Sequence, residues 1–351
     1  MNTENRRAVI DIESDPFGES SSAVAHKTMQ LLGGLFRFES DSLQLMRLVD
    51  HAYLGLPGHQ FSSKPPKFRV RLMLTPAPPR PARNKSAARR RAEPPPISML
   101  HGPDSLGAAT ESSTFILLSP KHRTALLSIS PSMLAFPYHT RYELLEFAVF
   151  TLAARAQHLV PLHAACVGID GRGILLMGAS GSGKTTVALN CLLNGFDFLS
   201  EDSVFVVPAT MRATGTSNFL HVRADSLRWL EKSRNRILIE KSPVIRRRSG
   251  VTKFEVDLRR KQFRLAPAPL KIEAVAFLTA TSGRPESLLR SMSKSEMLGK
   301  IAALQGYGAR LPQWQTFRRK LGKIKAFEVR RGKHPMEAVQ ALRSLLIHGG
   351  G

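Results

Sequence analysis

The sequence predicts an α/β protein in which a smaller α+β domain precedes a larger α/β domain. Two observations predict this arrangement. An apolar, strand-like run at 173–177 turns through a glycine-rich loop into a helix-like run at 184–193, the alternation that is typical of α/β folds. Before residue 156, strands instead follow one another with two amphipathic helices among them. With 351 residues, 42% of them hydrophobic, the chain is long enough for two cores.

The N-terminal α+β domain is expected to span residues 31–155, behind a disordered segment at 1–30. Leu35–Glu39 is expected to form a strand, and Asp41 is the expected N-cap of the amphipathic helix that follows. Further strands are expected at 65–76, 113–120 and 124–131, and a helix at 141–158. The stretch 76–97 is dense in Pro and Arg and is expected to be a disordered insert, whose basic run is either a solvated loop or a contact with nucleic acid.

The C-terminal domain is expected to span residues 156–351 and to carry the glycine-rich loop. Residues 162–178 predict two strands joined by a tight turn at Asp170–Gly171. A helix is expected at Lys184–Leu193. Later strands are expected at 203–208, 254–258, 274–280 and 326–330, with helices at 293–304 and 334–347.

The charge of the chain is basic and unevenly distributed. The formal net charge is +24, and 30 Lys and Arg stand against 10 Asp and Glu between Arg212 and Gly351. Such a field attracts phosphates, acidic peptides or nucleic acid, or it keeps a surface soluble. Cys166 and Cys191 form no CxxC pair, and neither a secretory leader nor an apolar run of membrane-spanning length is recognisable. A reducing cytoplasm is therefore the expected location.

The residues from Gly178 to Thr185 fit the pattern G-x-x-x-x-G-K-[ST] of a phosphate-binding loop (P-loop). Glycines let backbone N–H groups converge on phosphate oxygens, and Lys184 neutralises charge on the β- and γ-phosphates. The Thr185 hydroxyl can enter the shell of Mg²⁺, so ATP with Mg²⁺ is the expected ligand. Neither an N-K-x-D motif of GTPases nor an LSGGQ signature of ABC ATPases is present. The predicted nucleotide-binding residues are Gly178, Ala179, Ser180, Gly181, Ser182, Gly183, Lys184, Thr185 and Thr186.

Two acids follow the loop closely. Glu201 and Asp202 come 17 and 18 residues after Lys184, at the edge of the neighbouring predicted strand. A carboxylate there can accept a hydroxyl proton or hold Mg²⁺. His163 returns towards the same edge if the two strands pair through the Asp170–Gly171 turn. We therefore predict Glu201, Asp202, His163 and Lys184 as catalytic residues.

The stretch from His163 to Val207 resembles the catalytic core of HPr kinase/phosphorylase and its shorter relatives, including those of peptide-modification operons. The resemblance implies a P-loop core related to phosphoenolpyruvate carboxykinase, with ATP and Mg²⁺ as cofactors. It also implies transfer of the γ-phosphoryl group to a Ser or Thr of a protein or peptide, an HPr-like carrier or a ribosomal peptide precursor. In this comparison Glu201 accepts the proton, Asp202 lies beside it and His163 lies at the transferring phosphate.

The implied metal ligands are Thr185, Asp202 and Asp225. Asp225 and Glu240 are the candidates for the Mg²⁺-binding Glu of a second signature, Glu-Arg-Gly, which the bifunctional enzymes carry and this chain lacks. Because the bifunctional enzymes assemble, a homo-oligomer stays open beside a monomer.

Several alternatives remain open at this point. Arg246, Arg247, Arg248 and Lys253 either clamp developing charge or decorate an exposed loop. A nucleotide-dependent regulatory or nucleic-acid-binding protein would also account for the basic charge, although no helix-turn-helix, RNP or zinc-finger pattern is recognisable. A kinase of small molecules is the third alternative.

Overall fold

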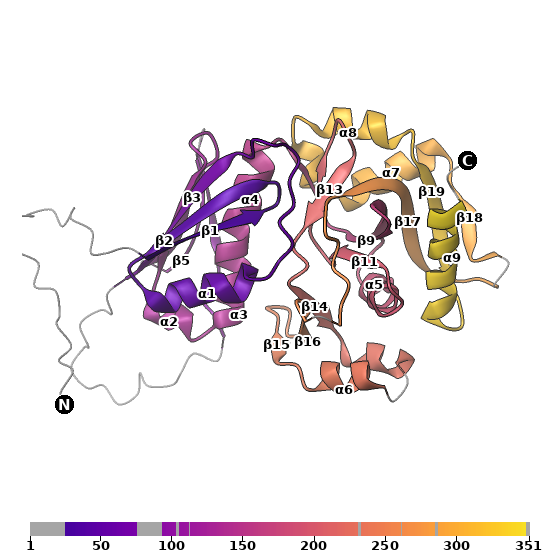
Figure 1. The fold of residues 1–351 in the computed structure, drawn as a ribbon, viewed down its shortest axis with the longest axis horizontal. Helices are drawn as coiled ribbons and strands as arrows, with labels where there is room; N and C mark the ends of the chain where they lie inside the picture. Colours follow the sequence, from indigo (N-terminus) through magenta and orange to yellow (C-terminus); the bar gives the residue numbers. More distant parts are fainter. Residues whose placement is uncertain are drawn as a thin grey trace, which may run out of the picture.

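The computed structural model describes residues 25–75, 93–102, 105–111, 113–230, 233–260, 262–284 and 287–348. It shows a mixed α/β fold with several sheets, arranged as two parts side by side (Figure 1). Of the stretches predicted to be disordered, residues 1–24 and 76–92 lie outside the described residues. In the described part of the chain, no helix is long and apolar enough to cross a membrane.

The N-terminal part is built on a seven-stranded mixed sheet with the order β1-β2-β3-β7-β6-β5-β4. Strands β2, β3 and β7 are parallel neighbours, and the remaining pairs are antiparallel. Its elements are β1 (Ala25–Leu31), β2 (Gly34–Ser40), α1 (Leu43–Tyr53), β3 (Lys67–Leu74), β4 (Ser98–His101), β5 (Leu106–Glu111), β6 (Thr114–Ser119), β7 (Thr124–Ile129), α2 (Pro131–Leu134), α3 (Pro137–His139), the π-helical turn η1 (Thr140–Glu146) and α4 (Phe147–Ala156).

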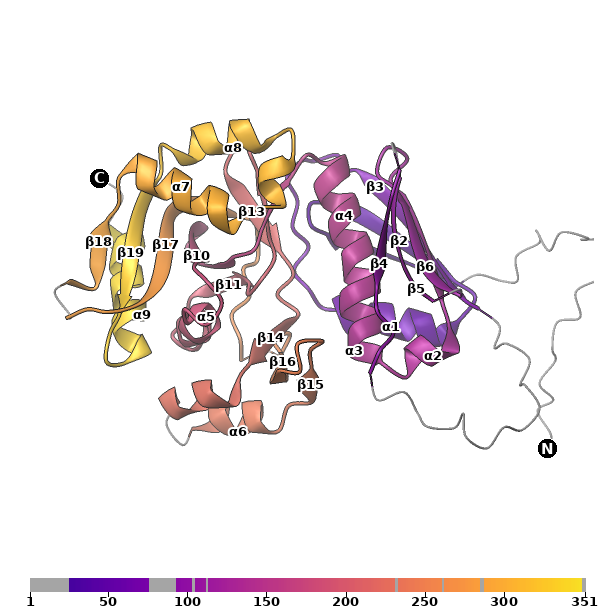
Figure 2. The same cartoon turned by 180° about the vertical axis from the view of Figure 1, so that it is seen from behind.

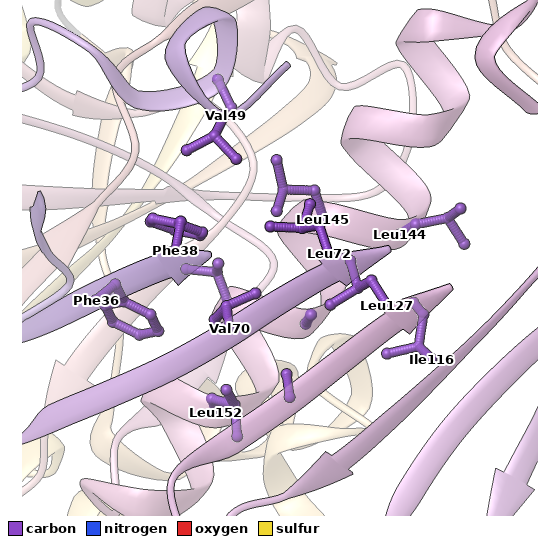
Figure 3. Packing of buried hydrophobic residues seen from close by; sticks show 14 of the residues in the cluster. Phe36, Phe38, Val49, Val70, Leu72, Ile116, Leu127, Leu144, Leu145 and Leu152 are labelled. Atoms are coloured by element: carbon purple, nitrogen blue, oxygen red, sulfur yellow. The ribbon is translucent and has the colours of Figure 1, made fainter. Parts of the chain in front are cut away.

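Alternation along β3 explains how this sheet is covered. Phe68, Val70 and Leu72 are buried while their neighbours in sequence are exposed. Helices α1 and α4 lie across the buried face (Figure 2), and their apolar stripes meet it at Val49 and Leu152 (Figure 3). This core fixes the position of η1 and α4, which border the site described below.

Two details of the N-terminal part differ from the sequence-based prediction. Residues 25–30, expected to be disordered, belong to strand β1, which pairs along its whole length with β2. The N-cap of α1 is Ser42 and not Asp41, because the Ser42 hydroxyl accepts the Leu45 backbone N–H at 3.4 Å.

The C-terminal part contains a nine-stranded sheet and a separate three-stranded sheet of order β14-β16-β15. Three strands of the large sheet, β10, β17 and β19, run parallel to one another. The elements are β8 (Val160–Leu162), β9 (Ala165–Ile169), β10 (Arg172–Met177), α5 (Lys184–Leu193), β11 (Asp197–Ser200), β12 (Val204–Val207), β13 (Arg212–Gly215), β14 (Phe219–Val222), the 3₁₀ turn η2 (Ala224–Trp229), α6 (Arg234–Glu240), β15 (Val244–Arg246), β16 (Thr252–Asp257), β17 (Leu270–Ser282), β18 (Leu289–Ser291), α7 (Lys294–Leu304), the 3₁₀ turn η4 (Gly308–Arg310), α8 (Trp314–Leu321), β19 (Lys325–Arg331) and α9 (Pro335–His348).

The large sheet is the middle of three layers. Along β10, Ile174 and Leu176 face the core shared with α5 and α9, whereas Leu175 and Met177 face the core shared with α7 and α8. Strand β10 is therefore buried on both faces, which explains its unbroken apolar run. The predicted turn is confirmed: β9 and β10 pair antiparallel through Asp170–Gly171, both of which have positive φ.

The two parts are joined by buried polar contacts. The His59 ring contacts the Thr214 hydroxyl and the Ala266 carbonyl, each at 2.8 Å. Phe205 of β12 packs into the N-terminal core. The Phe205 ring lies against Phe150 of α4, with ring centroids 5.2 Å apart.

Candidate functional site

The glycine loop, Gly178–Gly183, connects the carboxyl end of β10 to the N-terminus of α5. Its three glycines all have positive φ, and Gly183 is the N-cap of α5. A Cβ on Gly178 would lie 2.6 Å from the Leu278 carbonyl oxygen, so the loop needs glycine there. The N-terminus of α5 carries positive partial charge and unpaired N–H groups, which suits this loop to bind an anion.

Lys184 lies folded over the glycine loop. Its Nζ donates to the carbonyls of Gly178 at 2.8 Å and Ala179 at 3.3 Å. Burial lowers the pKa of this lysine, although the nearby charges of Asp202 and Glu201 act in the opposite direction. The ammonium group is thus held beside the loop with two carboxylates in its electrostatic neighbourhood.

Glu201 is buried and occupied by two partners. The Thr185 hydroxyl donates to Oε1 at 2.8 Å, and the His221 backbone N–H donates to Oε2 at 2.7 Å. Burial by itself raises the pKa of Glu201, but the bonds and charge of His221 outweigh it and hold the pKa below its ordinary value. Glu201 therefore stays ionised and fixes the first turn of α5.

A buried charge chain continues from this point into the N-terminal part. His221 Nε2 lies 3.3 Å from Glu255 Oε1, and Glu255 accepts a hydrogen bond from Arg141 of η1. Arg141 also donates to Glu146 at 3.2 Å. We call the series Glu201, His221, Glu255, Arg141 and Glu146 the buried charge chain; all its members are less than 9% exposed.

His163 and Asp202 form a second pair beside the loop, with His163 Nδ1 2.8 Å from Asp202 Oδ1. Gln305 holds the backbone of His163 through both its amide atoms. The hydrogen bond to Asp202 raises the pKa of His163. Burial acts to raise the pKa of Asp202, but His163 outweighs it and brings that pKa to about 2. The pair carries opposite charges at pH values between the pKa of Asp202 and that of His163.

Cations flank this pair on one side. Arg247 Nη2 lies 3.8 Å from Asp202 Oδ2, and its guanidinium stands 5.7 Å from the centroid of the Tyr142 ring. Lys253 adds a charge that acts on both Asp202 and Glu201. Arg246 instead pairs with Glu93 at 3.7 Å, and Arg248 pairs with Glu143 at 2.6 Å. Of the three predicted arginines, Arg247 is therefore the one that contacts Asp202.

A largely apolar cleft of about 460 Å³ opens at His163 and Asp202. It lies between η1–α4 of the N-terminal part and the segment that follows α7. Its lining includes Tyr142, Phe150, Leu304 and Tyr307, together with His163 and Asp202 but not Glu201.

The remaining predicted residues lie around this centre. Thr186 contacts Ser226 at 3.1 Å on the other side of the first turn of α5. Asp225 is exposed and pairs with Arg223 at 3.3 Å, and Glu240 pairs with Arg236 on α6. Within the described residues, no group of three or more His, Cys, Asp and Glu side chains is arranged to hold a metal by itself.

Sequence reasoning missed three buried residues of the site. His221, Glu255 and Arg141 lie on β14, β16 and η1, far from the loop in sequence. His221 and Glu255 are cross-strand partners on β14 and β16, and Arg141 reaches them only through the packing of the two parts, so no spacing rule connects the three residues. The sequence of η1 gives no signal of this burial, because Arg141 lies beside Glu143 and Glu146 as well as apolar residues.

Comparison with known proteins adds little to this geometry. No protein-family model and no curated protein sequence matches the chain. Among solved structures, the Hpr(Ser) kinase/phosphatase from Coxiella burnetii is similar at 14% identity with a TM-score of 0.27, over 54% of this chain and 99% of that one. At this TM-score the likeness does not establish the reaction of this chain.

Proposed function

We propose that the protein is an ATP-dependent kinase that transfers the γ-phosphoryl group to a Ser or Thr hydroxyl of a protein or peptide. The observation that carries this proposal is the division of the two acids after the glycine loop. Glu201 is bonded to Thr185 of the loop, whereas Asp202 is paired with His163 at the cleft of about 460 Å³, which we call the acceptor cleft. One acid thus serves the nucleotide side and the other the acceptor side.

On the nucleotide side, the backbone N–H groups of the glycine loop and the N-terminus of α5 receive the phosphates. Lys184 exchanges the carbonyls of Gly178 and Ala179 for phosphate oxygens. The Thr185 hydroxyl and the Glu201 carboxylate are hard oxygen donors that fit Mg²⁺. Mg²⁺ binds few protein ligands when phosphate oxygens complete its coordination shell. When bound, Mg²⁺ neutralises charge on the β- and γ-phosphates.

On the acceptor side, the substrate hydroxyl lies against Asp202. Its oxygen forms a bond to the γ-phosphorus, the bond from that phosphorus to the bridging oxygen of ADP breaks, and the hydroxyl proton passes to Asp202. A carboxylate with a pKa of about 2 is a weak base. Because phosphoryl transfer proceeds through a loose transition state, Asp202 contributes mainly by orienting the hydroxyl, and Arg247 by offsetting charge.

These roles exchange those expected from the sequence. The resemblance gave the proton-accepting role to Glu201 and a metal-binding role to Asp202. The buried position of Glu201 and its bond to Thr185 favour the reverse assignment. Asp225, paired with Arg223, is not part of this proposal for the metal.

The acceptor cleft supports a peptide or protein as substrate. It lies between the two parts of the molecule, and aromatic and aliphatic side chains form much of its wall. An extended segment with an apolar residue near its Ser or Thr would fill this space. Free serine or threonine would leave most of the apolar wall uncovered.

The test incubates the purified protein with ATP, Mg²⁺ and peptides encoded beside its gene, with free serine and threonine in parallel. Mass spectrometry should detect a peptide heavier by one phosphate. Asp202→Asn should lower the rate by a factor of about 10² through lost positioning of the hydroxyl, whereas Asp170→Asn, at an 84% exposed turn position, should not change it. Full activity of Asp202→Asn would remove the assignment.

A second function is favoured by the basic charge alone. The excess of Lys and Arg after Arg212 fits a nucleotide-dependent protein that binds nucleic acid. That function predicts DNA or RNA binding whose affinity falls steeply with salt, without transfer to any hydroxyl. A shallow salt dependence together with phosphorylated peptide would exclude it.

A further inference from the structure

A second pocket, of about 290 Å³, borders the glycine loop but shares no lining residue with the acceptor cleft. It is bounded by Gly181–Gly183 and Thr186, the carboxyl ends of β17 and β19, and the segment η2. Open α/β sheets bind ligands outside the carboxyl ends of their parallel strands. The volume is just below the roughly 300–1,000 Å³ that is typical of small-molecule sites.

The walls of this loop-side pocket are aromatic and cationic. Trp229 is partly exposed, with the Arg228 guanidinium 4.8 Å from its ring centroid. The ring of His334 stands at 88° to it with centroids 5.4 Å apart. Arg331, at the end of β19, is an exposed side chain for which no ion pair is found within the described residues. An aromatic ring beside unneutralised cations suits a ligand that has both a flat ring and a negative charge.

Two hydroxyl groups in the pocket point to a polar ligand as well. Ser182 Oγ and Thr279 Oγ1 are both buried, and neither has a hydrogen-bond partner within the described residues. Buried polar groups of folded proteins are nearly always paired. Ser182 and Thr279 both line the pocket, so a polar ligand bound there would lie next to two residues whose hydroxyl groups lack partners.

We propose that the loop-side pocket binds the nucleoside of the nucleoside triphosphate whose phosphates lie on the glycine loop. The base lies against Trp229, and Arg331 faces the negative charge at the start of the phosphate chain. This assignment rests on the proposed function, because it takes the glycine loop to hold the phosphates. It leaves the acceptor cleft free for the second substrate.

Titration calorimetry with two ligands distinguishes binding in the loop-side pocket from binding at the glycine loop. Mg²⁺-ATP carries the nucleoside, and Mg²⁺ with inorganic tripolyphosphate does not. Stacking of a base on an aromatic ring typically corresponds to a factor of about 5–150 in affinity. We expect Trp229→Leu to weaken ATP binding at least tenfold and tripolyphosphate binding less than twofold, and the matched Trp229→Phe to keep ATP binding within about threefold.

Tryptophan fluorescence reads the same contact in another way. The chain has two tryptophans, and Trp314 is 4% exposed in a different core. ATP should change the fluorescence of the wild type and of Trp314→Phe but not of Trp229→Phe, while tripolyphosphate should change none of them. This readout does not depend on the fold of the leucine variant.

The outcomes distinguish the two proposals. Suppose that the wild type binds both ligands. If Trp229→Leu then weakens the binding of ATP and of tripolyphosphate equally, or weakens the binding of neither, the pocket assignment is overturned while the glycine loop keeps its role. A fluorescence change that survives in Trp229→Phe overturns it too. If the wild type binds neither ligand, the proposed function fails and the pocket assignment fails with it.

Discussion

Replacing Arg141 by methionine removes the cation from the buried charge chain that joins the two parts of the molecule. Arg141 is 1% exposed, donates to Glu255 and Glu146, and lies 4.1 Å from the centroid of the Phe219 ring. Methionine fills a similar apolar volume but removes the cation from Glu146 and leaves Glu255 with His221 alone. The change therefore isolates the charge from the packing.

The expected loss follows from these contacts. Hydrogen bonds between charged groups contribute about 1.5–3 kcal/mol each, and breaking a buried ion pair from one side typically destabilises by about 3–5 kcal/mol. Burial already raises the pKa of Glu146, so this carboxyl can take up a proton and soften the loss. We expect a decrease of about 4 kcal/mol in the free energy of unfolding, which corresponds to roughly 5 °C in Tm for a chain of this length.

Calorimetric and urea unfolding of the full chain measure this loss. The matched control is Arg248→Met, which breaks the pair with Glu143 at a 34% exposed arginine and should change stability by less than about 1 kcal/mol. A double-mutant cycle of Arg141→Met with Glu255→Gln should give a coupling energy of about 0.5–3 kcal/mol. A loss no larger than that of the control would refute the idea that the chain is a buried, charged connection.

Two further predictions concern pH and the glycine loop. Burial acts to lower the pKa of His221, but the bonds of His221 to Glu201 and Glu255 outweigh burial and raise this pKa above 6.5. The stabilisation of the fold by protonated His221 is therefore complete below pH 6.5 and is lost as pH rises through the folded-state pKa. The pKa values of Glu201 and Glu255 lie below 4.5, so the stabilisation from these two carboxylates is present above pH 4.5 and is lost on acidification. We therefore expect the highest Tm between pH 4.5 and 6.5. A Tm that keeps rising above pH 7 would contradict this. Gly178→Ala should abolish binding of Mg²⁺-ATP, because the added Cβ would meet the Leu278 carbonyl. Gly181→Ala has open space around the added Cβ, so it should lower only the free energy of unfolding, by about 1 kcal/mol, through its positive φ. Titration calorimetry with Mg²⁺-ATP and calorimetric unfolding of both variants test this difference. Equal effects of the two substitutions on binding and on stability would contradict it.

The parts of the fold that the sequence predicts are those fixed by local pattern. The Asp170–Gly171 turn, strand β10 and helix α5 follow from turn chemistry and apolar periodicity within a few residues. Strand β1 was missed because polar and apolar residues do not alternate clearly in AHKTMQL, and its pairing with β2 supplies the order. Asp41 and Ser42 are both good N-caps, and only the backbone geometry selects between them.

The candidate site divides in the same way. His163, Lys184 and Asp202 lie in one stretch of sequence, and spacing alone predicts that they approach one another. Arg141 and Glu255 are 114 residues apart, so only the docking of the two parts brings them together. The sequence predicts both acids close to the loop but does not show which of them is buried, because the His221 backbone N–H that binds Glu201 comes from β14, a separate strand.

The central claim is that the glycine loop binds a nucleoside triphosphate through Lys184. Titration calorimetry with Mg²⁺-ATP on the full chain, beside Lys184→Met, measures it directly. The account predicts one binding site in the wild type and an affinity at least tenfold weaker in the variant. No heat of binding in the wild type, or equal affinity in the two proteins, would contradict it.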